Sequence, residues 1–381
     1  MDRRTFLSAG LVSAAATQKK YRAAVIGHTG HGDYGHGLDL AWQPFDFIEV
    51  VAVADPDEDG LARALARTGA KRGYRNYREM LRKEKPDLVS VGPRWLDQRV
   101  EMVTAAAEAG CHVYLEKPFA RDLVDADRMV EAVERHGVRL QVAHQMCRNP
   151  NTLLCREMLR QGEIGALQEV RARGKEDRRA GGEDIAVDGC HQMVVLRMLL
   201  GDPKWVFAHV THDGREIGRE HIKEASEPIG PIAGNQIAAL FAFDGGVHAY
   251  FGSKANDLTD PKRFGYYFYG SAGVIYMPNG VETQPYILRS PAWMPDERRR
   301  WEKIEAPRDA GRWVKAEGRG LANARMVGDL LEAIEHGRDP VCNARDGRWS
   351  TEMIVSIYES QRTAGRVSFP LKERRHPLSR L

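Results

Sequence analysis

A glutamate, a lysine and a proline stand together at Glu116, Lys117 and Pro118, directly behind the apolar segment CHVYL. That segment is typical of a buried strand that ends in a turn at these three residues. Open α/β sheets bind ligands at the carboxyl ends of their strands, so a lysine at this point is placed to meet a ligand. Without that context, a surface lysine before a proline is unremarkable.

A glycine-rich segment, GHTGHGDYGHG, follows the first strand-like stretch and contains Gly27, Gly30, Gly32 and Gly35. Glycines let the backbone turn tightly and approach a pyrophosphate, which the N-terminus of a following helix then stabilises. The regular GxGxxG spacing is not met, because Thr29 stands at the second glycine. A glycine-rich turn without a ligand therefore remains an alternative.

The second strand-like stretch ends in Asp55, where a dinucleotide-binding fold places its ribose-binding carboxylate. The extra residues LDLAWQPFD explain why Asp55 follows Gly27 at more than the usual spacing of about 20 residues. A carboxylate accepts hydrogen bonds from ribose hydroxyls and repels a 2′-phosphate. The pattern predicts a nucleotide site that prefers NAD, with NADP possible.

Apolar segments alternate with amphipathic helical stretches over residues 21–145, which predicts a parallel sheet covered on both faces. The expected strands are 21–27, 47–55, 87–93, 111–118 and 138–145, and the expected helices are 57–69, 97–110 and 122–137.

The pattern changes after Pro150, and residues 146–370 are expected to form a second α/β domain. Several of its strand-like segments end in glycine-containing turns, which is typical of an antiparallel meander. Its C-terminal helices are expected near the domain interface. Helices are expected at 151–162, 188–201, 322–337 and 345–365, strands at 167–175, 204–214, 235–246, 247–254, 263–271 and 273–280, and a surface loop at 289–313.

Composition excludes several classes of protein. The 56 basic and 53 acidic residues of the 381-residue chain nearly balance, which gives no electrostatic reason to expect nucleic acid. The five cysteines contain no CxxC, and no histidine cluster has the spacing of a metal site, so neither a disulfide framework nor a bound metal is expected. No apolar run reaches the ~18 residues of a membrane span.

The N-terminus has the pattern of a twin-arginine export signal. Arg3 and Arg4 precede Phe6 and Leu7, and a short apolar stretch then ends in small residues. We expect a signal over residues 1–18 and a periplasmic protein. The alternative is a frayed N-terminus of a cytoplasmic protein. Twin-arginine export carries folded proteins, commonly with a cofactor already bound.

These features, together with AGCHVYLEKPFA, the helix containing DGCH and the tail NARMVGDLLEAIEHGRDPV, resemble the Gfo/Idh/MocA oxidoreductases, the glucose–fructose oxidoreductase and inositol dehydrogenase family. The resemblance covers nearly the whole chain after the signal. It implies an N-terminal Rossmann domain with a doubly wound parallel sheet. It also implies a C-terminal α/β domain with a large open, mainly antiparallel sheet, which often mediates homo-oligomerisation, and a bound nicotinamide cofactor.

The resemblance implies that Lys117 lies beside the nicotinamide and the substrate hydroxyl. A partly desolvated lysine near a cationic ring loses proton affinity, which suits it to proton exchange. The predicted cofactor-binding residues are Gly27, His28, Thr29, Gly30, Gly32, Asp55, Pro93, Glu116, Lys117, His144 and Gln145.

The resemblance also implies that His191 moves a proton. On one continuous helix Asp184, Asp188 and His191 would share a face, so that a carboxylate could orient the imidazole while it takes a hydroxyl proton. Many relatives have Asp four residues before this histidine, and here that position is Val187. The alternatives are that Asp188 or Asp184 substitutes for it, or that Lys117 and His191 work alone. Asp184 as a helix N-cap is the structural alternative.

The segment GPRWLDQR, after the third expected strand, also departs from the family pattern. Its Arg94 and Trp95 suit the hydroxyls and the face of a sugar. The expected function is an NAD(P)-dependent oxidoreductase acting on a sugar or polyol hydroxyl. The first alternative is a redox-neutral glycosidase or lyase that oxidises its sugar transiently. The second is a non-catalytic sugar or nucleotide sensor on the same fold.

Replacing Arg3 and Arg4 by lysine should trap the full-length precursor in the cytoplasm if residues 1–18 form a twin-arginine signal. Cell fractionation and immunoblotting would measure this. Normal periplasmic accumulation of the double variant would show that the assignment is wrong.

Overall fold

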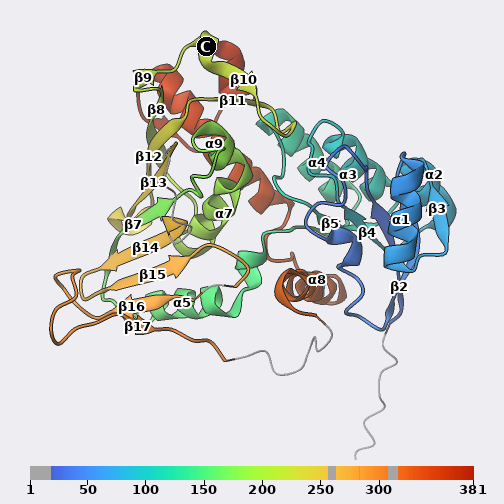
Figure 1. Ribbon diagram of the computed structural model, residues 1–381, viewed down its shortest axis with the longest axis horizontal. Coiled ribbons are helices and arrows are strands. Elements are labelled where there is room, and N and C mark those ends of the chain that lie inside the picture. Colours follow the sequence, from blue (N-terminus) through green and yellow to red (C-terminus); the bar gives the residue numbers. More distant parts are fainter. Residues whose placement is uncertain (1–18, 256–262, 283, 308–315) are drawn as a thin grey trace, which may run out of the picture.

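The computed structural model describes residues 19–255, 263–282, 284–307 and 316–381, so the predicted export signal lies outside the described residues. Two domains lie side by side, with the N-terminal domain in blue to cyan and the second domain mainly in green to orange (Figure 1). Within the described ranges, we find no helix long and apolar enough to cross a membrane.

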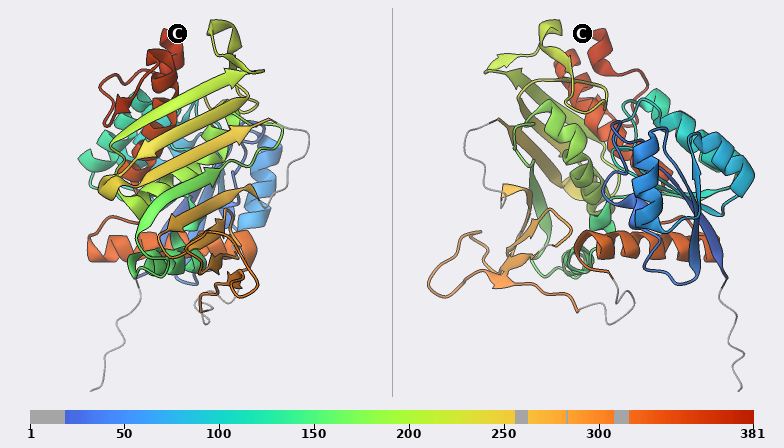
Figure 2. Two further views of the ribbon diagram at one scale, coloured as in Figure 1. Left: turned by 90° about the vertical axis from the view of Figure 1, so that its left-hand side faces the viewer. Right: turned by 45° about the vertical axis from the view of Figure 1, so that its right-hand side comes forward.

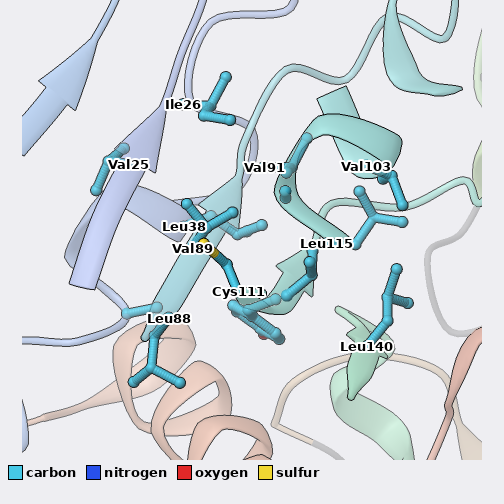
Figure 3. Packing of buried hydrophobic residues seen from close by; sticks show 14 of the residues in the cluster. Val25, Ile26, Leu38, Leu88, Val89, Val91, Val103, Cys111, Leu115 and Leu140 are labelled. Atoms are coloured by element: carbon cyan, nitrogen blue, oxygen red, sulfur yellow. The ribbon is translucent and has the colours of Figure 1, made fainter. Parts of the chain in front are cut away.

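The N-terminal domain contains the predicted parallel sheet, with strand order β3-β2-β1-β4-β5-β6. Side chains from neighbouring strands, including Val25, Val89 and Leu115, fill its core (Figure 3). Strand β3 of this sheet was not predicted from the sequence, because its three residues are mostly exposed and carry no apolar pattern. The strands are β1 Tyr21–Ile26, β2 Ile48–Ala54, β3 Arg72–Tyr74, β4 Leu88–Val91, β5 His112–Leu115 and β6 Leu140–Val142.

Side-chain caps define the helices of this domain. Asp57 accepts a hydrogen bond from Gly60 N at the start of one helix, and Asp122 accepts one from Asp125 N at the start of another. Gly69 ends the first of these helices with a left-handed φ of 74°. The helices are α1 Glu58–Thr68, α2 Tyr77–Glu84, α3 Arg99–Glu108 and α4 Leu123–Arg135.

The connection between β1 and β2 differs from the prediction, because no α-helix follows the glycine-rich loop. Only the short 3-10 helix η1, Leu38–Leu40, lies between the two strands. Gly30, Gly32 and Gly35 all have left-handed φ values, so the backbone cannot continue as a right-handed helix. The expected stabilisation of a pyrophosphate by a helix N-terminus is therefore wrong for this loop.

The second domain is built on a mixed, mostly antiparallel sheet with the order β17-β16-β15-β14-β7-β13-β12-β8-β18, and β9 pairs with β8. The single parallel pair among these joins β13 to β7. A separate ribbon pairs β10 (Ile222–Glu224) with β11 (Pro231–Ala233). The sheet strands are β7 Leu167–Arg173, β8 Trp205–His212, β9 Arg215–Glu216, β12 Gln236–Ala242, β13 His248–Lys254, β14 Gly265–Gly270, β15 Val274–Pro278, β16 Tyr286–Leu288, β17 Glu302–Lys303 and β18 Val367–Ser368.

Helices cover the face of this sheet that is turned towards the N-terminal domain, whereas no helix of the described residues covers the opposite face (Figure 2). The helix α8 lies against the N-terminal domain instead, where the Gln141 amide donates to Asp329 Oδ2 at 3.2 Å. The helices are α5 Pro150–Arg160, α6 Gly182–Val187, α7 Gly189–Leu200, α8 Gly318–His336 and α9 Ala344–Thr363.

Gly35→Ala should lower the free energy of unfolding by more than Gly30→Ala. Both residues have left-handed φ, which costs alanine about 1–2 kcal/mol. A Cβ at Gly35 would in addition lie 2.5 Å from Gly92 O, whereas a Cβ at Gly30 meets nothing within 4 Å. Urea unfolding monitored by circular dichroism measures both variants. Equal destabilisation would mean that the loop does not lie against β4 as described.

Candidate active site

Lys117 reaches from the carboxyl end of β5 to the second domain. Its ammonium donates to the backbone carbonyl of Val187 at 3.0 Å, and the residue is only 5% exposed. Val187 is the last residue of α6, next to the start of α7. A buried lysine thus lies where the two domains meet.

Glu116 connects the glycine-rich loop to the carboxyl end of β5 by hydrogen bonds. Its carboxylate accepts hydrogen bonds from His36 N at 2.7 Å and Lys117 N at 3.0 Å, and His36 Nδ1 lies 2.9 Å from Oε1. Burial by itself would raise the pKa of Glu116, but the hydrogen bonds and charge of His36 and the charge of Lys117 hold it below the usual range. Glu116 therefore positions the loop and the backbone of Lys117.

Arg99 stabilises the turn at Glu116, Lys117 and Pro118, a role that was not predicted from the sequence. The guanidinium is 1% exposed and donates to the carbonyls of Glu116, Pro118 and Pro93. Burial lowers the pKa of Arg99 to about 10, so it stays charged at neutral pH. The peptide bond between Lys117 and Pro118 is cis. Pro93, predicted to touch the cofactor, contributes its carbonyl to this network.

His144 and His191 form a pair across the domain boundary. Their Nδ1 atoms lie 2.9 Å apart, and their rings are nearly perpendicular at 86°. His144 is fully buried after β6, and His191 is partly exposed in the first turn of α7. Burial and the charge of Lys117 lower the pKa of His144 to about 3, and burial with nearby His144 and Lys117 holds the pKa of His191 well below 6.5. Both imidazoles are neutral at pH 7.

Neither carboxylate that was predicted to orient His191 bonds to its imidazole, although the backbone N–H of His191 donates to the backbone carbonyl of Asp188 at 3.2 Å. The helix is interrupted at Asp188, so Asp184 and His191 do not share one continuous face. Asp184 is buried and accepts hydrogen bonds from Ser253 Oγ, Glu176 N and Lys175 N. It is also not the N-cap of α6, which is Gly181.

Asp188 instead pairs with Arg179 at 2.8 Å. Val187 lies where many relatives carry their aspartate, and its side chain is buried in a small apolar cluster with Leu96 and Ile229. The structure therefore brings no carboxylate of Asp184 or Asp188 to His191, and the predicted orienting role of both residues is corrected.

One potential metal donor each from His144, Cys190 and His191 lies within 4.8 Å of the others. No such cluster was predicted from the sequence, because the two histidines come from different domains and their spacing matches no metal-binding motif. The same atoms already have protein partners: the two imidazoles face each other, and Cys190 Sγ donates to Val187 O at 3.1 Å. Burial raises the pKa of the Cys190 thiol to about 12, so it is uncharged without a metal.

Asp55 lies at the end of β2, as predicted, but its carboxylate is already used within the protein. It accepts from Thr29 N, Thr29 Oγ1 at 2.7 Å, Tyr34 OH at 2.7 Å and Asp57 N at 3.0 Å, and it is fully buried. A carboxylate offers about four lone-pair sites, so none is left for a ribose hydroxyl. In this structure Asp55 anchors the glycine-rich loop, which corrects its predicted direct role.

A dinucleotide nevertheless fits this end of the domain. A hollow of about 260 Å³ opens beside Gly27, His28 and Asp55 at the carboxyl ends of β1 and β2. A Cβ at Gly30 would meet nothing within 4 Å, so a ligand can approach the backbone there. The site offers an accessible backbone at Gly30 beside an open hollow.

The remaining predicted residues lie near this site but contact the protein itself. A Cβ at Gly32 would lie 2.4 Å from Arg94 N, so Gly32 lies against the chain that follows β4. The Gln145 amide donates to Asn323 Oδ1 on α8 at 2.8 Å. Trp95 and Asp97 both contact His31 of the glycine-rich loop. His36, Arg99 and Asn323 carried no sequence signal, because their partners are distant in the chain.

Known protein families match the two domains separately. The Gfo/Idh/MocA oxidoreductase family with its NAD-binding Rossmann fold matches residues 21–144, and the Gfo/Idh/MocA C-terminal domain matches residues 152–276. D-apiose dehydrogenase of Paraburkholderia graminis is 32% identical over 50% of this chain and 53% of its own length. The chain thus spans about half the length of that relative. Myo-inositol 2-dehydrogenase of Thermotoga maritima is 26% identical over 62% of this chain and 75% of its own length.

Solved structures share the fold of both domains. Levoglucosan dehydrogenase in complex with NADH and levoglucosan superimposes with a TM-score of 0.73 at 19% identity, covering 93% of this chain and all of the other. Family models match both domains, and the first of them describes an NAD-binding Rossmann fold. The chain belongs to the Gfo/Idh/MocA oxidoreductase family.

Proposed function

We propose that the protein is an NAD-dependent dehydrogenase that oxidises a hydroxyl group of a sugar or polyol. The observation that carries the proposal is the contact of Lys117 with Val187 at the end of α6, just before the helix α7 that carries His191, at the boundary of the two domains. Relatives named for the oxidation of apiose and inositol support the substrate class.

Side chains of the protein would transfer the hydroxyl proton during the reaction. Oxidation of the carbinol carbon releases a hydride and the hydroxyl proton, and a carbonyl forms. Bound NAD supplies the hydride acceptor. Lys117 and His191 would both meet the hydroxyl, and positioned acid–base groups of this kind accelerate proton transfer. The neutral His191 imidazole can accept or donate a proton at Nε2, because its Nδ1 is occupied by His144.

The loop Gly27–Gly35 and Asp55 would hold the cofactor at the other end of the site. Asp55 would act by keeping the loop in place, through its hydrogen bonds to Thr29 and Tyr34. An exported holoprotein must regenerate its cofactor on a second substrate or run a redox-neutral cycle, because free nicotinamide cofactor is scarce outside the cytoplasm. The proposal that the protein is exported rests only on the twin-arginine pattern at Arg3 and Arg4.

The uncovered face of the large sheet supports self-association as a further part of this proposal. Phe207 and Tyr250 are 46% and 41% exposed there, and both line a broad hollow that also contains arginines. Exposed apolar patches of this kind mark interaction surfaces. The expected occupant is a second copy of the chain, and light scattering after size-exclusion chromatography tests it.

Lys117→Ala should lower the rate of cofactor reduction by about 10²–10⁴-fold and leave NAD affinity nearly unchanged. Lys117→Arg should not restore the rate, because a guanidinium does not release its proton near neutral pH. Single-turnover NADH absorbance with a panel of sugars and polyols measures the effect. A near-wild-type rate for Lys117→Ala would remove the lysine from the chemistry. Product formation without net NADH would instead indicate the redox-neutral reaction.

Asp55→Ala and Thr29→Val should both weaken NAD binding, because each removes part of the anchor of the glycine-rich loop. The expected loss for Asp55→Ala is about 1–3 kcal/mol from charge-assisted hydrogen bonds. Thr29→Ser keeps the hydroxyl and serves as the matched control. Calorimetric titration with NAD measures all three. Unimpaired binding by Thr29→Val beside a weakened Asp55→Ala would show that the carboxylate contacts the cofactor directly.

A further inference from the structure

The partner of His191 is another histidine, where a carboxylate was expected. His144 Nδ1 lies 2.9 Å from His191 Nδ1, and neither Asp184 nor Asp188 reaches the ring. We propose that His144 is the positioning residue of the site: its imidazole takes the place of the orienting carboxylate and holds His191 ready to move the substrate proton. The proposal rests on the proposed dehydrogenase function.

The geometry of the pair determines what each nitrogen can do. One Nδ1–H donates and the other Nδ1 accepts, and this bond holds the ring of His191 in one direction. His191 then presents Nε2 as the remaining nitrogen of a partly exposed ring. His144 is fully buried, so its ring cannot turn away into solvent.

The pair also joins the domains. His144 follows β6 of the Rossmann domain, and His191 lies in the first turn of α7 in the second domain. Only when the two domains are docked as described is the imidazole of His191 oriented. The second link at the same boundary, from Lys117 to Val187, holds the lysine beside the pair.

The groups around the pair disfavour a charged imidazole. His191 experiences the positive charges of Lys117 and Arg319, and His144 experiences the opposing charges of Lys117 and Glu116. Glu116 is already engaged with His36 and Lys117 N. The neighbouring Cys190 thiol is uncharged. An aspartate in place of His144 would stabilise the protonated form of His191, so the two kinds of partner predict different pH behaviour.

Four variants separate these possibilities. His144→Asn can keep a hydrogen bond to His191, His144→Phe retains a ring without one, and His144→Asp supplies the carboxylate. His112→Gln is the matched control, because His112 is a half-buried histidine at the opposite end of β5. Each is measured with ¹⁵N-histidine spectra across pH without substrate, by NAD calorimetry, and by the pH profile of kcat/KM.

His144→Phe should lower kcat/KM by about 10- to 100-fold, less than the loss of an acid–base group itself, with NAD affinity within about twofold. His144→Asn should keep most of the rate. His144→Asp should make His191 titrate at higher pH, and the acid limb of the profile should move upward with it. His112→Gln should change none of these quantities.

Several results would overturn the proposal. An unchanged His191 titration in both His144→Asp and His144→Phe would show that the rings are not coupled, even if dehydrogenation is confirmed. A drop in NAD affinity that accounts for the whole rate loss would make His144 a cofactor residue. Stoichiometric zinc in the purified holoprotein, measured by elemental analysis, would replace the pair by a metal centre with Cys190. The spectra need no turnover, so failure to find a sugar substrate overturns only the proposed function.

Discussion

The buried carboxylate of Glu116 is the interaction on which the active site depends. It joins the glycine-rich loop through His36 to the strand end that carries Lys117. A buried carboxylate needs such partners, because an unpaired charge in this environment would be costly. Glu116 therefore couples the position of the loop at the cofactor end to the backbone of Lys117.

Three further groups extend this arrangement. Arg99 satisfies the carbonyls of the turn from the Rossmann side, and Asn323 of α8 donates to the carbonyl of His36 at 3.2 Å. Lys117 and the histidine pair then cross to the second domain. The bonds around Glu116 thus form one hydrogen-bonded network, and such networks hold side chains more firmly than isolated contacts do. The histidine pair is a separate link between the domains.

One departure from the family pattern, Val187, is connected with the histidine pair. Val187 occupies the position of the usual aspartate, and its side chain packs among apolar residues while its carbonyl accepts from Lys117. His144 stands against the ring of His191 that a carboxylate would otherwise orient. The Rossmann domain thereby supplies a partner that the helix of the second domain lacks.

The sequence by itself determined the parallel sheet, the change to an antiparallel sheet and the placement of Lys117 at a strand end, because these follow from local hydrophobic periodicity and turn residues. It also indicated the nucleotide loop, but not that Thr29 and Tyr34 would occupy Asp55. Only the tertiary structure decided the break at Asp188, the loss of the helix after β1 and the pairing of His144 with His191. Those features depend on contacts between residues far apart in the chain, for which spacing along the sequence carries no signal.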